Sequence, residues 1–182
     1  MGGHNSYCPL TTEELQEYEG VTGMNTAEIT QAFKKFYKID PLTFMEHRKG
    51  RIPYLTVAET LPELKNNPFR YRIGKVFCSS ETGFMDFDDF LEMAAAMHDK
   101  TPLNVRLHWA FQIYDINEDG VICENDLDKM LDLLTDNRLL KSEKEGIILR
   151  ILSDGDTDAD SALSFQEFER SISLNWKQEF EE

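Results

Sequence analysis

Two short stretches of the sequence place oxygen-bearing groups at the spacing that a divalent cation needs. A twelve-residue loop can supply such an ion with oxygens from positions 1, 3, 5, 7 and 12, and position 9 often acts through water. Residues 115–126 offer five candidate ligands, in order Asp115, Asn117, Asp119, the Val121 carbonyl and Asp126. We therefore predict that this stretch, called loop 3 below, holds a cation.

Residues 156–167, called loop 4, fit the same spacing more fully, with the candidate ligands Asp156, Asp158, Asp160, the Ala162 carbonyl, Ser164 and Glu167. An alternative register that starts at Asp154 would put Phe165 at position 12, so we reject it. Position 6 carries Ser161, where the sharp turn favours glycine. The left-handed conformation costs a residue with a β-carbon roughly 1 kcal/mol, which four carboxylates should outweigh. We predict that loop 4 is the strongest calcium site.

Loop 3 differs from loop 4 at the residue that closes it. Gly120 suits position 6, but Cys123 at position 9 is a poor oxygen donor. Asp126 is one methylene shorter than glutamate, so we expect it to reach the ion through a single oxygen. Coordination then falls from seven toward six, the number that magnesium requires. Loop 3 is therefore predicted to bind Mg²⁺, or Ca²⁺ more weakly.

Helical signals dominate the remaining sequence. Capping-box pairs at Thr11/Glu14 and Asn25/Glu28 predict two early helices. Pro68 suits the first turn of a helix within residues 66–77. Apolar residues recur around four loops at helical spacing, each loop carrying an apolar residue at position 8. Those position-8 residues, expected to pair in short strands, are Ile52, Met85, Ile122 and Leu163.

The first two loops lack the ligands for an ion. The second has Cys78 at position 1 and Ser80 at position 3, and the first has Thr56 at position 12. We predict an all-α, two-lobed protein with four helix-loop-helix units, two metal-binding and two vestigial, and short paired loop strands. The expected domains are an N-terminal arm (1–24), an N-terminal lobe (25–100), a C-terminal lobe (101–173) and a short acidic tail (174–182).

Composition excludes several function classes. The net charge is −15, so a nucleic-acid partner would be repelled. Three dispersed cysteines form neither a zinc spacing nor a disulfide framework, which favours a reducing compartment. The four histidines form no catalytic or metal-binding spacing, and we expect no enzyme activity. The apolar runs are too short to span a bilayer, and the polar N-terminus predicts no secretory signal.

Several of these segments together resemble the calcium- and integrin-binding protein family, a branch of the EF-hand superfamily near calcineurin B. They are "LPELKNNPFRYRI" (61–73), "AFQIYDINEDG" (110–120), two vestigial N-terminal loops and an Asp closing loop 3. The resemblance extends from "TTEELQEYEG" to Phe168. Family members usually carry a longer C-terminal extension, which puts autoinhibition by the short tail of this chain in doubt.

The resemblance implies a calcium- and magnesium-binding adaptor or sensor. Its partner would be an apolar helix from a cytoplasmic segment of a membrane protein. That protein would be an integrin α subunit, or a transmembrane channel-like mechanotransduction channel with this chain as auxiliary subunit. Alternatives are a cytosolic calcium buffer and a calcineurin B-like regulatory subunit of an enzyme. Met93, Met97 and Met130 are candidates for lining a target groove, or for plain core packing.

The N-terminal sequence "MGGHNS" matches the myristoylation frame at Gly2. One such chain gives only marginal membrane binding, so we expect a partner to supply the rest of the attachment. Cys8 could take a second acyl chain. The expected location is cytoplasmic, peripheral at the inner face of the plasma membrane.

Overall fold

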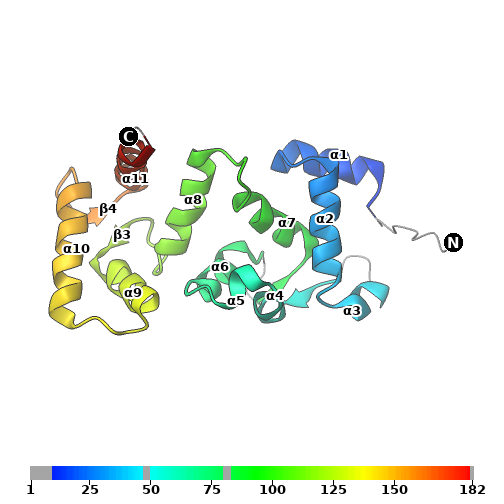
Figure 1. Cartoon of the computed structure of the whole chain (residues 1–182), viewed down its shortest axis with the longest axis horizontal. Coiled ribbons are helices and arrows are strands. Elements are labelled where there is room, and N and C mark those ends of the chain that lie inside the picture. Colours follow the sequence, from blue (N-terminus) through cyan, green and yellow to red (C-terminus); the bar gives the residue numbers. More distant parts are fainter. Residues whose placement is uncertain (1–9, 47–49, 80–82, 181–182) are drawn as a thin grey trace. The chain divides into compact units, whose positions relative to one another are not determined.

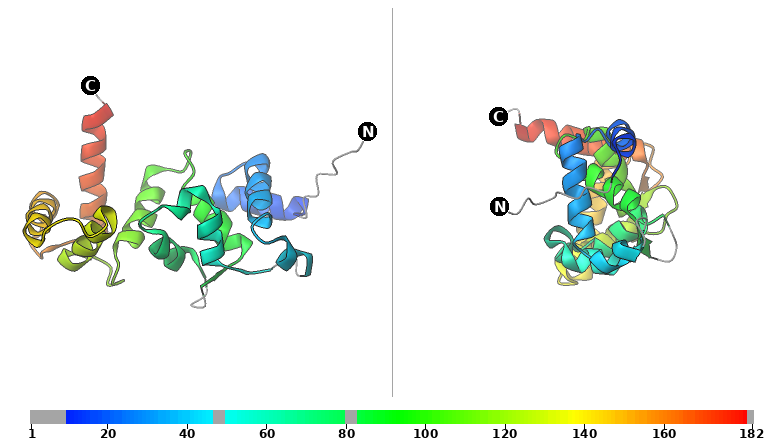
Figure 2. Two further views of the ribbon diagram at one scale, coloured as in Figure 1. Left: turned by 60° about the horizontal axis from the view of Figure 1, so that its bottom comes forward. Right: turned by 90° about the vertical axis from the view of Figure 1, so that its right-hand side faces the viewer.

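A computed structural model describes residues 10–46, 50–79 and 83–180 of the chain, and the side chains of all but a few of them. Gly2 and Cys8 lie outside these ranges. The chain divides into two compact units, unit 1 (Met1–Thr101) and unit 2 (Pro102–Glu182). Figures 1 and 2 show their helices and short strands. In the part of the chain that the structure describes, no helix is both long and apolar enough to cross a membrane.

Unit 1 is a helical array in which both predicted capping boxes form. Thr11 and Glu14 cap one helix, and Asn25 and Glu28 cap the next, through reciprocal side chain-to-backbone hydrogen bonds. The elements are α1 (Thr12–Thr22), α2 (Thr26–Tyr37), α3 (Pro41–Glu46), β1 (Ile52–Pro53), α4 (Tyr54–Thr60), α5 (Pro62–Lys65), α6 (Arg70–Phe77), β2 (Phe84–Met85) and α7 (Phe87–Ala96).

The core of unit 1 lies where α2 packs on α7. Phe36 of α2 is fully buried, and its ring stacks on that of Phe90 with 4.8 Å between centroids. Strands β1 and β2 pair in antiparallel fashion with Ile52 opposite Met85, and both of these side chains are fully buried. The two vestigial loops are therefore joined through their position-8 residues, as predicted.

Unit 2 repeats this plan around the two complete loops. Its elements are α8 (Leu103–Tyr114), β3 (Ile122–Cys123), α9 (Glu124–Thr135), α10 (Lys141–Gly155), β4 (Ala162–Leu163) and α11 (Phe165–Phe180). Ile122 of β3 pairs with Leu163 of β4. Both join one apolar cluster, whose other buried members are Leu107, Phe111, Leu127, Ile148 and Phe168. The predicted all-α fold with paired loop strands is thus confirmed.

Two element boundaries differ from what the sequence suggested. Pro68 does not lie in the first turn of α6, because the Asn67 side chain accepts a hydrogen bond from the Phe69 N–H and holds a turn before Arg70. In addition, α11 continues to Phe180, so most of the predicted tail at 174–182 is helical. Figure 2 shows this last part of α11 standing clear of the other elements of unit 2.

Candidate metal centre

Loop 3 lies between the end of α8 and the start of α9. Asp115 follows the last residue of α8 directly, and its carboxylate accepts hydrogen bonds from the N–H groups of Glu118 (2.8 Å) and Gly120 (2.9 Å). Gly120 has φ +89°, a conformation that disfavours any residue with a β-carbon. The sequence therefore curls the loop around the carboxylate at position 1.

Asp126 closes loop 3 from the first turn of α9 and has no exposed surface. Its Oδ1 atom accepts hydrogen bonds from Ile116 N–H (3.1 Å) and Asn117 N–H (3.2 Å), and its Oδ2 atom accepts one from Cys123 N–H (3.1 Å). The shorter aspartate thus reaches backbone donors on both sides of the loop. Burial of a carboxylate is tolerated here because the backbone satisfies both of its oxygens.

Loop 4 has the same design with a different residue at its turn. Asp156 follows α10 and accepts hydrogen bonds from Ala159 N–H (2.7 Å) and Ser161 N–H (2.9 Å). Ser161 has φ +68°, so it takes the left-handed conformation expected of position 6. Asp154 lies in the last turn of α10, mostly exposed, and pairs with Arg150 on the same helix. This geometry fits a loop that begins at Asp156.

Glu167 closes loop 4, and its carboxylate accepts four hydrogen bonds. Oε1 accepts from the N–H (2.7 Å) and hydroxyl (2.8 Å) of Thr157. Oε2 accepts from the N–H (2.9 Å) and hydroxyl (2.7 Å) of Ser164. The Thr157 N–H first, and then the Ser164 hydroxyl, lower the pKa of Glu167 to about 2. The side chain is therefore fixed as a carboxylate at physiological pH.

The carboxylates of each loop converge closely enough for a single ion. Oxygens of Asp115, Asp119 and Asp126 all lie within 4.8 Å of one another, and so do those of Asp156, Asp158 and Glu167. Desolvation raises the pKa of Asp158, and the negative charges of Asp160 and Glu167 raise it further. A bound divalent cation would relieve this repulsion, so the donor set fits a hard cation such as Ca²⁺ or Mg²⁺.

Not every predicted ligand joins these trios. Asp160 accepts a hydrogen bond from Ala162 N–H (2.9 Å), and the Asn117 side-chain amide donates to Asp119 Oδ2 (2.7 Å). None of these contacts tests whether the Val121 and Ala162 carbonyls act as ligands. The assignment of all eleven ligands therefore stays a prediction, with the two trios as its structural core.

Sequence reasoning missed two contributors to these loops. Thr157 at position 2 provides both donors to Glu167 Oε1. The sequence feature that could have predicted this contact is a hydroxyl-bearing residue next to an acidic ligand position. Cys123 was judged only as a poor oxygen donor, yet its Sγ donates to Asp126 Oδ2 at 3.0 Å.

In the described residues of the two unit 1 loops, the acidic side chains contact other groups of the protein. Asp89, at position 12 of the second loop, is buried and accepts hydrogen bonds from Ser79 N–H (3.3 Å) and Asp86 N–H (3.2 Å). Arg51, from the first loop, pairs with Asp86 at 3.4 Å. A guanidinium therefore provides positive charge beside the acids that remain in the second loop.

A groove of about 450 Å³ opens in unit 2 beside the two loops. Its apolar lining comes from all four long helices of the unit and includes Tyr114, Leu127, Met130, Ile151, Phe168 and Ile172. Leu127 and Phe168 follow the closing acids Asp126 and Glu167 directly in sequence. A shift of either closing acid would therefore move a residue of the groove.

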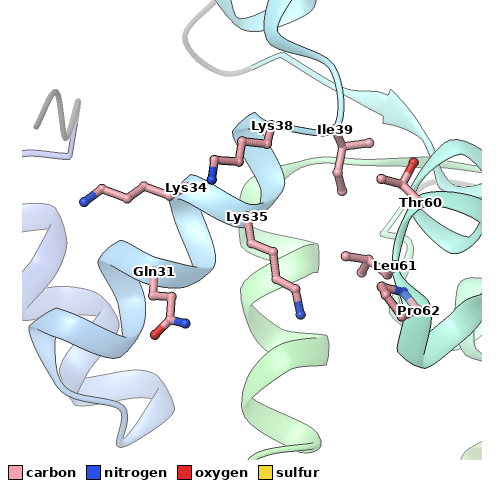
Figure 3. Close-up of a pocket in the computed structure, with 8 residues that line it drawn as sticks. All are labelled: Gln31, Lys34, Lys35, Lys38, Ile39, Thr60, Leu61 and Pro62. Carbon is pink, nitrogen blue, oxygen red and sulfur yellow. The ribbon is translucent and has the colours of Figure 1, made fainter.

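The hollows of unit 1 include one of about 360 Å³ and one of about 420 Å³. The first includes Met93, which is buried, and Met97, which is 48% exposed, so these two methionines divide between core and surface. The second lies beside the end of α2, where Lys34, Lys35 and Lys38 gather in an otherwise acidic chain. Figure 3 shows Lys35 reaching toward Leu61 and Pro62 while Lys34 extends away from them.

Comparison with known proteins agrees with this geometry. The family model for an EF-hand domain pair matches residues 104–173, which include both acidic loops. Human calcium and integrin-binding family member 3 is 33% identical over 172 residues, covering 92% of this chain and 91% of that protein. Family member 2 of the mouse is 32% identical over 171 residues, with 92% and 91% coverage. Family member 2 of Drosophila melanogaster is 32% identical over 173 residues, with 92% coverage of each. The chain belongs to the calcium and integrin-binding family.

Proposed function

We propose that the protein is a non-enzymatic adaptor whose unit 2 binds an apolar helix when its loops hold divalent cations. The observation that supports this most directly is the groove of about 450 Å³ in unit 2, lined by α8, α9, α10 and α11. Amphipathic helices commonly dock their apolar face in such grooves, and Met130 gives the lining an adaptable side chain.

Ion binding and groove shape are coupled through the closing acids. Asp126 lies in the first turn of α9 and Glu167 in the first turn of α11. A cation that draws either carboxylate toward its loop pulls on the start of that helix. Leu127 and Phe168, the next residues in sequence, line the groove. Ion binding at either loop would therefore move a groove residue that is adjacent to the closing acid.

The two loops are proposed to bind different ions. Loop 4 takes Ca²⁺ because Glu167 offers two oxygens and three aspartates precede it. Loop 3 takes Mg²⁺, or Ca²⁺ more weakly, because Asp126 is shorter and Asn117 replaces one carboxylate.

The proposed partner is an apolar helix in the cytoplasmic segment of a membrane protein. The names of the relatives point to integrins, and an integrin α tail is the first candidate. A transmembrane channel-like mechanotransduction channel is the second, with this chain as an auxiliary subunit. Both would present an amphipathic helix, so the groove alone does not separate them.

Attachment at the cytoplasmic face of the plasma membrane is proposed to combine three weak contributions: a myristoyl group on Gly2, the bound partner and the lysines at the C-terminal end of α2. A cationic side chain near an anionic leaflet contributes about 1 kcal/mol, and one acyl chain alone gives marginal binding. Flotation with anionic vesicles should therefore be reduced by either Gly2→Ala or Lys34→Glu/Lys38→Glu, provided that the protein is expressed with the myristoylating enzyme.

Calorimetry with a helical peptide from an integrin α cytoplasmic segment tests the adaptor function. We expect binding in Ca²⁺ or Mg²⁺ and much weaker binding in chelator. Ile172→Glu places a charge in the groove and should abolish binding. Leu140→Glu is the matched control, because Leu140 is 68% exposed and is not part of the groove lining.

A pure calcium buffer would give a different result in the same experiment. It would take up ions with unchanged affinity in both variants and would bind neither the integrin peptide nor a channel peptide. That outcome would refute the adaptor proposal and leave ion binding standing.

A further inference from the structure

One hollow of unit 1 gathers positive charge in a chain that is otherwise strongly acidic. This lysine hollow, of about 420 Å³, has in its lining Lys34, Lys35, Lys38, Ile39, Leu61 and Pro62. None of the described residues that line it is acidic, although the chain has a net charge of −15. The dipole of a helix favours cations at its C-terminal end, so the lysines alone would not indicate a ligand. The apolar space beside them is the second observation.

That space is a hollow of about 360 Å³ with a buried apolar floor. This methionine hollow has in its lining Met24, Leu64, Phe90 and Met93, all buried, and the exposed Met97. Gln31, Lys35 and Leu61 line both hollows, which therefore lie side by side. The lysines thus border an apolar pocket and not merely an open surface.

The three lysines have different places in this arrangement. Lys35 Nζ lies 2.6 Å from Glu63 Oε1, and its side chain reaches toward Leu61 (Figure 3), so it is held at the wall between the hollows. Lys34 and Lys38 are exposed and lie one helical turn apart on α2. Side chains at this spacing are neighbours, and the lysine stem is flexible, so both ammonium groups can close on one anion.

The ligand that suits both hollows is an amphiphile with an anionic head and a thin apolar chain. An α-helix with its side chains is about 10–12 Å across. Such a helix in the methionine hollow would bring its apolar face against the exposed charges of Lys35, Glu63 and Asp99. A single acyl chain can pass between these charges to the buried floor, where methionine adapts its shape to varied apolar groups.

We propose that unit 1 binds one anionic phospholipid, with its phosphate held by Lys34 and Lys38 and one acyl chain in the methionine hollow. This site goes beyond the partner groove of unit 2, and it gives the lysines of the proposed membrane attachment a defined ligand. Both hollows are lined by residues of unit 1 alone. Lipid binding therefore needs no cation in loop 3 or loop 4.

Three soluble probes test the proposal on the full chain without a membrane. Dodecyl phosphate combines the anionic head with the chain, inorganic phosphate has only the anion, and dodecylphosphocholine has the same chain on a zwitterionic head. In calorimetry with chelator, below the concentrations at which micelles form, dodecyl phosphate should bind at one site. The other two should bind at least about tenfold more weakly. Equal binding of either one would overturn the proposal, because one half of the site would then have no role.

Methionine methyl resonances show where the probe binds. Dodecyl phosphate should shift the signals of Met93 and Met97 and leave that of Met130, in the groove of unit 2, unchanged. A shift of Met130 without one of Met93 would place the amphiphile in the partner groove and overturn the proposal. Loss of dodecyl phosphate binding in the chain myristoylated at Gly2 would also overturn it, because the hollow would then hold the chain's own acyl group.

Surface variants test the two halves of the site separately. Lys34→Gln/Lys38→Gln should weaken dodecyl phosphate binding by roughly 10- to 30-fold, since each lysine near an anionic lipid contributes several-fold. Met97→Glu puts a charge beside the acyl chain and should weaken binding by at least about tenfold. Lys65→Gln is the matched control, because Lys65 is exposed and lines neither hollow. Circular dichroism should be the same in all of these variants.

Unchanged affinity in Lys34→Gln/Lys38→Gln or in Met97→Glu, or an equal loss in Lys65→Gln, would refute the lipid site. The integrin peptide keeps this result separate from the adaptor function. If the peptide binds with Ca²⁺ or Mg²⁺ but dodecyl phosphate does not bind, the lipid site is refuted and the adaptor proposal is untouched. If dodecyl phosphate binds at unit 1 and the peptide does not bind, the adaptor proposal fails and the lipid site stands.

Discussion

Replacing Glu167 by glutamine should remove most calcium binding at loop 4. The substitution keeps the shape of the side chain but turns one of its two oxygens into an NH₂ group. In the unsubstituted protein, each oxygen of Glu167 accepts two hydrogen bonds, one from a backbone N–H and one from a hydroxyl. Whichever way the new amide is oriented, its NH₂ group must face two donors.

The structure sets the size of the effect. The hydroxyl of Thr157 or Ser164 can rotate away, but the N–H of the same residue is fixed by the loop. One buried N–H then loses its acceptor, which costs about 1–3 kcal/mol without any metal. Loss of the negative charge weakens the ion contact as well. One charge-assisted contact of about 1.5–3 kcal/mol corresponds to roughly 10- to 100-fold in calcium affinity.

Calcium titration calorimetry measures this loss, and thermal unfolding in chelator measures the metal-free cost separately. Asp154→Asn is the matched control, since it makes the same charge change two residues before the loop, on a mostly exposed side chain that pairs with Arg150. Calcium affinity that is unchanged in Glu167→Gln would refute the reasoning. An equal loss in Asp154→Asn would show that the loop begins at Asp154.

Three further results are expected. Asp126→Glu should raise the calcium affinity of loop 3 by roughly tenfold in calorimetry, because the longer side chain can offer a second oxygen; unchanged affinity would contradict the role assigned to chain length. Burial, reinforced by the charges of Asp89 and Asp86, raises the pKa of Cys78 to about 11. The rate of Cys78 alkylation, followed by mass spectrometry, should therefore rise between pH 10 and 11. Unit 1 should also lose stability as the pH increases from about 9 toward 11, because the thiol ionises at a lower pH in the unfolded chain than in the folded one. Half-maximal alkylation near pH 8.5 would argue against this. Gly74→Ala should lower the melting temperature of unit 1, because the added carbon would come within 2.3 Å of the buried Tyr54 ring. Overpacking of this kind typically costs about 1–3 kcal/mol. An unchanged melting temperature would mean that the ring moves freely.

Much of this protein could be predicted because the signals are local. The ligand spacing of loops 3 and 4 lies within twelve residues each, and the capping boxes lie within four. The pairing of Ile122 with Leu163 followed from their shared position in the repeat and is observed. Such features depend on the spacing of residues along the chain and on the identity of neighbouring side chains, and both can be read directly from the sequence. The start of α6 was misplaced because the Asn67 side chain, which accepts a hydrogen bond from the Phe69 N–H, holds a turn at Pro68 before the helix begins.

Other properties depended on which residues from distant segments meet in space. Met93 and Met97 share one apolar stripe in sequence, yet the first is 3% and the second 48% exposed. Arg51 approaches Asp86 across 35 residues, and four separate helices line the groove of unit 2. The sequence by itself determined where oxygen donors cluster, because ligand spacing is a local property of the chain. Only the tertiary structure decided which carboxylates are buried, which thiol lies against them and where apolar surface stays open, because burial is set by packing between segments far apart in sequence.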